Sequence, residues 1–244
     1  MSVVPTRRER LREATLAEIK DVARRFLVSE GPSAISLRAI AREIGMTAPG
    51  LYRYFGSRED LVDDLVADFF QELCGEMEHA RDAEAADDLA GRLLAVSRAF
   101  RAWAVAHPAE FGLVFGTPMP AMGVPPPDGD DAGARFEGIF LELFVELWRR
   151  RPFPVPSAGE MDQSLLRQLR VFGDQTGAGL PVGAVMMFVT CWIRLYGVVA
   201  MEVFGHLRFC LEDAQPMFEQ ALEELSGMLG IASPSAPGQN PPRR

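Results

Sequence analysis

Apolar side chains recur every three to four positions along most of the chain, which is the period of an α-helix. No stretch shows the sustained alternation of apolar and polar positions that is typical of half-buried strands. The pattern therefore predicts an all-α protein. Beyond residue 80 we expect helices at about 86–107, 108–115, 131–150, 161–176, 181–205 and 214–229.

The first helix has a clear start and end in the sequence. Thr6 and Glu9 have the T-x-x-E spacing of a capping box, which predicts a helix that begins near Arg7. Gly31 and Pro32 end it. Its expected inward stripe consists of Leu11, Thr15, Ile19, Val22 and Phe26.

Three further helices are predicted before residue 80, each opened by a hydroxyl side chain at its N-cap. They span about 36–45, 48–55 and 57–80, and their caps are Ser36, Thr47 and Ser57. Proline-rich stretches at 116–131 and 152–156 predict loops, and 231–244 predicts a disordered tail.

The two short helices meet at the turn Gly45-Met46-Thr47, and their apolar residues share one side. This is the pattern of a helix-turn-helix, whose second helix enters the major groove of DNA. The expected inward residues are Leu37, Ile40, Ala41, Ile44, Leu51 and Phe55.

Residues able to contact DNA lie on the opposite side of this motif. Helix-start amides and hydroxyl groups can donate to phosphate oxygens, and arginines supply positive charge. Thr47 either only caps its helix or also contacts phosphate, and Arg53 either lies in solvent or reads a guanine edge. The predicted DNA-binding residues are Arg7, Arg8, Ser36, Arg38, Thr47, Ala48, Pro49, Gly50, Tyr52, Arg53, Tyr54, Ser57 and Arg58.

Charge separates the N-terminal quarter from the rest of the 244-residue chain. Residues 1–60 carry 11 basic and 8 acidic side chains, a net charge of +3, whereas the other positions carry 14 and 26, a net charge of −12. The local field matters more to a polyanionic partner than the total of −9. The N-terminal quarter is therefore the part that favours nucleic acid.

These residues resemble the TetR (tetracycline-repressor) family of bacterial transcription regulators. The resemblance rests on I-S-L-R-A-I-A-R-E-I-G-M-T at 35–47 and P-G-L-Y-R-Y-F-G-S-R-E-D-L at 49–61. The family more often has lysine where Arg58 stands and threonine where Ser36 stands. The resemblance implies a three-helix DNA-binding domain over residues 1–56.

Two motifs farther along resemble one ligand-binding subclass of that family: H-P-A-E-F at 107–111 and W-I-R-L-Y-G at 192–197. The resemblance implies a helical ligand-binding and dimerisation domain over 57–230, followed by the tail. Dimers of this kind pair their last two long helices, here 181–205 and 214–229. The first of these is apolar nearly all round, which a subunit interface would cover.

The resemblance also implies an effector pocket among the aromatic side chains of the second domain, most of which are expected to be plain core. The predicted pocket residues are Phe100, Trp103, Phe111, Phe140, Phe144 and Met187. Their apolar character favours a small hydrophobic effector.

The sequence therefore predicts a homodimeric, ligand-responsive repressor that an effector releases from a palindromic double-stranded DNA operator. The helix at 57–80 joins both domains and is the expected lever. One alternative is a helical enzyme domain fused to a DNA-binding module, and another is an interaction protein with a vestigial helix-turn-helix. No catalytic signature is present, and we expect no cofactor.

The remaining sequence features point to the cytoplasm. Three cysteines stand far apart without a C-x-x-C pair, and three histidines are scattered, so we expect neither a disulfide framework nor a metal site. Redox sensing by Cys191 or Cys210 is a minor alternative to simple burial. No secretory leader is expected, and the apolar stretch at 180–193 is too short to span a membrane.

Overall fold

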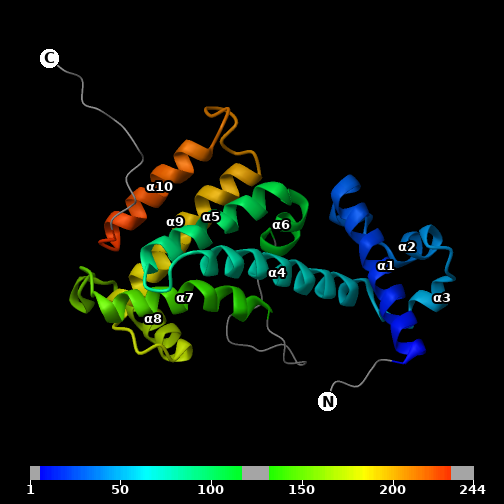
Figure 1. Ribbon diagram of the computed structural model, residues 1–244, viewed down its shortest axis with the longest axis horizontal. Coiled ribbons are helices and arrows are strands. Elements are labelled where there is room, and N and C mark those ends of the chain that lie inside the picture. Colours follow the sequence, from blue (N-terminus) through cyan, green and yellow to red (C-terminus); the bar gives the residue numbers. More distant parts are fainter. Residues whose placement is uncertain (1–5, 117–131, 232–244) are drawn as a thin grey trace. The chain divides into compact units, whose positions relative to one another are not determined.

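The computed structural model describes residues 6–116 and 132–231 and confirms an all-α fold without strands in these ranges (Figure 1). The predicted loop from 117 onward and the tail from 232 onward lie outside the described residues. Two short 3-10 helices, Pro32–Ala34 and Ala158–Glu160, are additions to the predicted pattern. The helices are α1 Arg7–Glu30, α2 Leu37–Glu43, α3 Ala48–Leu51, α4 Arg58–Ala83, α5 Leu89–Ala106, α6 Pro108–Phe115, α7 Ala132–Arg150, α8 Gln163–Thr176, α9 Val182–Val203 and α10 Gln215–Met228.

The helix starts follow the predicted caps with one exception. The Thr6 side chain accepts from the amide of Glu9, and Thr47 Oγ1 accepts from the amide of Gly50 over 3.2 Å. Ser36 occupies the N-cap position of α2, but its side chain makes no capping hydrogen bond, so that part of the prediction is wrong.

The helix predicted over 48–55 is shorter than expected. It ends at Leu51, because the amides of Arg53 and Tyr54 bond to carbonyls only three residues back, at Gly50 and Leu51. This tighter turn brings Phe55 into the core, where it is 6% exposed.

The first compact unit contains residues 1–72 and 107–120, and its core holds most of the predicted inward residues. Ile40 and Leu51 are fully buried, whereas Ile44 is half-buried. Leu11 is 60% exposed, because no other described residue covers the first turns of α1. The buried stripe of α1 therefore starts at Ile19.

The second compact unit contains residues 73–106 and 121–244, and α9 packs against α5, α7, α8 and α10 in it (Figure 1). Phe100, Phe136, Phe140 and Trp192 form one aromatic cluster at its centre, with ring centroids 5.5–6.4 Å apart. Edge-on and tilted arrangements of this kind are the favourable ones for aromatic rings. This cluster joins α5, α7 and α9.

The two units divide the chain differently from the predicted boundary at residue 56. The division falls inside α4, after Glu72, and α6 belongs to the first unit. Ion pairs connect these helices within the first unit: Arg24 on α1 binds both Glu72 on α4 and Glu110 on α6, each over 2.8 Å. Such partners are far apart in sequence, so local patterns do not indicate them.

Of the described helices, α9 is the one long and apolar enough to cross a membrane by length and composition. One third of its most apolar window is buried inside the structure. Core helices of soluble proteins share this composition, but most of their surface is buried. The helix α9 therefore leaves an apolar face exposed in the described part of the chain.

Candidate nucleic-acid interface and apolar cavity

The surface of the first unit around α3 presents the predicted groove-facing residues to solvent. Leu51 is completely buried and anchors the helix, whereas Tyr52 is 46% exposed and Arg53 is exposed on the following turn. Thr47 and Pro49 are exposed at the start of the helix. Because α3 buries Leu51, its opposite side and N-terminal end are free to approach a partner.

Several predicted residues meet in one open notch of this surface. The chain brings the end of the α1–α2 connection, the start of α2 and the start of α4 together there. The predicted residues that line the notch are Ser36, Arg38, Tyr52, Ser57 and Arg58. The Ser36 hydroxyl makes no capping hydrogen bond, and its O–H can donate to an approaching phosphate.

Arg58 has a second role that the sequence does not indicate. Its Nε donates to the carbonyl of Ile35 over 2.9 Å, and its Nη2 donates to the carbonyl of Pro32 over 2.8 Å. These bonds hold the α1–α2 connection against the start of α4. Arg58 is thus first a positioning residue, although its remaining N–H groups can still face a phosphate.

Ser57 is also engaged within the protein. Its hydroxyl donates to Asp60 over 2.8 Å, and the amide of Asp60 donates back to Ser57 Oγ over 3.0 Å. These reciprocal bonds fix the first turn of α4. Ser57 therefore shapes the notch, and its hydroxyl proton is already used.

Tyr54 has a partner that the sequence analysis missed. The guanidinium carbon of Arg12 lies 5.8 Å from the centre of the Tyr54 ring, within the range of a cation–π contact. Arg12 follows the predicted Arg8 by one helical turn, and both it and Arg7 are exposed. The i, i+4 spacing is the signal that could have added Arg12 to the predicted set.

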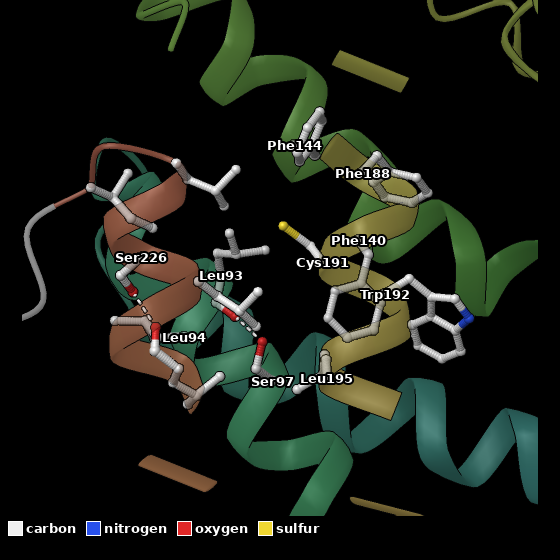
Figure 2. Close-up of a pocket in the computed structure, with 14 residues that line it drawn as sticks. Leu93, Leu94, Ser97, Phe140, Phe144, Phe188, Cys191, Trp192, Leu195 and Ser226 are labelled. Atoms are coloured by element: carbon white, nitrogen blue, oxygen red, sulfur yellow. Dashed lines mark hydrogen bonds between the residues drawn. The ribbon is translucent and has the colours of Figure 1, made fainter. Parts of the chain in front are cut away.

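The second unit contains an apolar cavity of about 60 Å³. Fourteen residues line it, from α5, α7, α9, α10 and the segment after α10 (Figure 2). Of the predicted pocket residues, Phe140 and Phe144 on α7 line this cavity. Phe188, Cys191 and Trp192 on α9 line it as well, and Figure 2 shows the Cys191 sulfur pointing toward it.

The other predicted pocket residues lie elsewhere. Phe100 and Trp103 are buried in the core of the second unit, and Met187 is half-buried on α9; none of them lines the cavity. Phe111 lies on α6 in the first unit, fully buried with its ring 4.9 Å from that of Phe115. Sequence periodicity marks all of these as inward-facing, but only packing separates a cavity wall from solid core.

The cavity wall carries no charge among the residues that the structure describes. Burial raises the pKa of the Cys191 thiol to about 12, so this side chain stays neutral. Across the described ranges, no group of three or more histidine, cysteine or acidic side chains is placed to hold a metal ion. The arrangement suits an uncharged organic molecule.

Comparisons with known families find one model for each end of the chain. Residues 19–65 match the family model of bacterial regulatory proteins of the tetR family, and residues 93–225 match that of the tetracyclin repressor-like C-terminal domain. The chain is 32% identical over 205 residues to the HTH-type transcriptional regulators Rv1816 of Mycobacterium tuberculosis and Mb1846 of Mycobacterium bovis. These alignments cover 82% of this chain and 85% of each relative.

Solved structures show the same fold. The crystal structure of the protein SCO4313 is 31% identical and superposes with a TM-score of 0.67, covering 91% of this chain and all of that one. A tetR-family regulatory protein from Rhodococcus RHA1 superposes with a TM-score of 0.53 at 14% identity, over 89% of this chain and 98% of that one. The second likeness concerns the fold alone.

Proposed function

Because the chain belongs to the TetR family of bacterial regulatory proteins, whose members are helix-turn-helix transcriptional regulators, we propose that it is a homodimeric cytoplasmic repressor. A small apolar effector releases it from a palindromic operator. The relatives it matches are named as regulators, which favours this function over an enzyme fused to a DNA-binding module.

The proposal rests on the residues that the outward side of α3 and the neighbouring notch expose to solvent. Tyr52 and Arg38 project from a rigid core onto a surface that also holds the free hydroxyl of Ser36. In a helix-turn-helix, such residues contact phosphates on either side of the major groove while the start of the second helix meets the base edges. A charge of +3 over residues 1–60 favours the same partner.

Dimerisation is supported by an uncovered apolar stripe on α9. Ile193, Met201 and Phe204 are 63%, 43% and 41% exposed, and their spacing places them on one side of the helix. Gly197 lies between them and leaves room for the close approach of a second helix. A second copy of this stripe provides a matching apolar surface, as two-fold symmetry requires.

Effector response is supported by the cavity between α5, α7, α9 and α10. A ligand there can change DNA affinity only by binding one conformation of the dimer more tightly than another. In a dimer the two α3 helices must sit about 34–36 Å apart to meet successive major grooves. The helix α4, which runs through both units, is the proposed lever that changes this spacing.

The central test is a fluorescence-anisotropy titration with DNA from upstream of the gene, compared with a scrambled duplex at several salt concentrations. We expect tight sequence-selective binding whose logarithm falls with the logarithm of salt, by about 0.9 per phosphate contacted. Tyr52→Phe removes one hydroxyl donor and should weaken binding about tenfold, whereas Tyr196→Phe, in the second unit, should not.

The proposal would be refuted if the protein bound neither duplex at low salt and if selection from a random DNA pool gave no bound sequence.

The dimer is tested separately by sedimentation velocity. Met201→Glu should produce monomers, and Val171→Glu, which alters a 57% exposed residue on α8, should leave dimers intact. Monomeric wild-type protein at micromolar concentration would refute the dimer.

A further inference from the structure

Two serines stand out among the buried residues of the second unit. Ser97 on α5 is 5% exposed and Ser226 on α10 is 2% exposed. In the described part of that unit, they are the buried residues with a hydrophilic side chain, and both line the apolar cavity. Two hydrophilic side chains in an otherwise apolar cavity wall indicate that the ligand carries a polar group.

The direction of their hydrogen bonds defines what they can bind. The Ser97 hydroxyl donates to the carbonyl of Leu93 over 2.9 Å, and the Ser226 hydroxyl donates to the carbonyl of Leu222 over 2.7 Å (Figure 2). A hydroxyl oxygen that donates its proton still carries two acceptor lone pairs. Both serine oxygens can therefore accept a hydrogen bond from a ligand while they keep their bonds to the backbone.

The remaining wall holds no cation among the described residues, and the indole nitrogen of Trp192 points away from the space that the Cys191 sulfur enters (Figure 2). It contains leucine, isoleucine and aromatic side chains together with Cys191, whose thiol remains protonated. A carboxylate that entered would lose its water without gaining a cation, and a serine could donate to it only by giving up its bond to a backbone carbonyl. A neutral molecule with a single hydroxyl group loses much less hydration free energy, and its O–H can donate a hydrogen bond to a serine oxygen.

We propose that the effector is an uncharged alcohol or phenol whose hydroxyl group donates to Ser97 or Ser226. This inference rests on the proposed function, because it describes the ligand of the same cavity. The cavity of about 60 Å³ is smaller than the roughly 150 Å³ that accommodates benzene in an engineered protein core. An aromatic occupant must therefore push the walls apart, which supplies the conformational preference that effector release requires.

The test compares three para-ethyl benzene derivatives of similar size by isothermal titration calorimetry with the full-length protein. Para-ethylphenol donates a hydrogen bond, para-ethylanisole only accepts, and para-ethylbenzoate is an anion at neutral pH. We expect the phenol to bind about threefold to tenfold more tightly than the anisole, which corresponds to one neutral hydrogen bond. The benzoate should bind at least about a hundredfold more weakly than the phenol.

The double variant Ser97→Ala/Ser226→Ala should bind phenol and anisole with equal affinity and keep the anisole affinity of the wild type. Alanine is well tolerated in both helices. The matched control is Ser29→Ala: this exposed serine on α1 makes the same bond to the carbonyl four residues back, over 2.7 Å, and lies outside the cavity. It should leave the phenol preference unchanged.

Operator binding is measured on the same preparations. The inference is overturned if the wild type binds the phenol and the anisole equally, or if the double variant still prefers the phenol. It is also overturned if the benzoate binds more tightly than the phenol, or if none of the three compounds binds. If sequence-selective DNA binding persists in such a case, the regulator stands and only the ligand class is wrong. If the wild type does not bind DNA at all, the proposed function itself is refuted.

Discussion

Arg24 on α1 donates a hydrogen bond from Nε to Oε1 of Glu110 on α6 over 2.8 Å, although 86 positions separate the two residues. Glu110 is 3% exposed, and Arg24 also pairs with Glu72 on α4. One arginine therefore connects three helices of the first unit. It also links α6, whose sequence directly follows α5, to α1 in that unit.

We predict that Arg24→Met destabilises the protein by about 3 kcal/mol, because it leaves the buried Glu110 carboxylate without its cation. The neighbouring Arg25 is a matched control: its side chain is 65% exposed and pairs with Glu43 over 3.6 Å. Arg25→Met should cost less than about 0.5 kcal/mol. Urea unfolding followed by circular dichroism measures both values.

The double variant Arg24→Met/Glu110→Leu should recover most of the loss, since an apolar pair replaces a desolvated ionic one. Failure to recover would show that Glu110 has further partners that carry its stability. Equal effects of the substitutions at Arg24 and Arg25 would contradict the assigned role of burial.

Arg58 gives a second prediction, which separates positioning from phosphate contact. Arg58→Lys keeps the charge but cannot reach both Pro32 and Ile35 with a planar fork, so we expect a loss of about 1–2 kcal/mol in stability. The salt dependence of operator binding should stay the same. A decrease of about 0.9 in its slope in Arg58→Gln would instead identify Arg58 as a phosphate contact.

Local signals predict much of this fold, and long-range packing explains what they miss. The capping residues Thr6, Thr47 and Ser57 mark helix starts, because a cap and its amide lie within three positions. The two hydrogen bonds from Arg58 to the α1–α2 connection span 23 and 26 positions, so no local sequence pattern indicates them.

The cavity illustrates the same limit. Phe140 and Phe144 are predictable as inward-facing residues of α7, and they line it. Ser97 and Ser226 are not predictable as lining residues, because a serine on a helix is usually exposed, and only the arrangement of α5 and α10 buries these two. Conversely, Phe111 fits every sequence criterion but belongs to the other unit.

The contact between Arg12 and Tyr54 predicts that the proposed DNA-binding surface includes Arg12, which lies outside the sequence motif. Arg12→Gln removes a cation that lies over the ring, so we expect operator affinity to fall about threefold to tenfold. Arg10→Gln, on another side of the exposed first turns of α1, is the control and should change affinity less. Equal losses in the two variants would indicate a general effect of charge rather than the Tyr54 contact.

Acid should loosen the link between α5 and α10. A bidentate hydrogen bond from Arg98 lowers the pKa of Glu219, so the ionised carboxylate stabilises the folded state above its ordinary pKa and this stability is lost as the pH falls through the lowered value. Both side chains are more than one third exposed, so the effect should stay below about 1 kcal/mol.

The check is urea unfolding of wild type and Glu219→Gln at neutral pH and well below the ordinary pKa of a glutamate. The variant should be less stable at neutral pH and equal to the wild type in acid. Glu223→Gln, which changes an exposed glutamate on the same helix, should show no such convergence. A constant difference at both pH values would refute the assigned pKa shift.

The cysteines allow a decision on redox sensing, which the sequence alone leaves open. Burial raises the pKa of Cys191 to about 12 and that of Cys74 to about 11, whereas Cys210 is exposed. Because the thiolate is the reactive species, Cys191 should react with iodoacetamide at least about a hundredfold more slowly in the folded protein than in urea. Cys210 should be alkylated first, as peptide mass spectrometry can measure. Alkylation of Cys191 as fast as Cys210 in the folded protein would contradict burial as the controlling factor and make the cavity wall itself a candidate redox sensor.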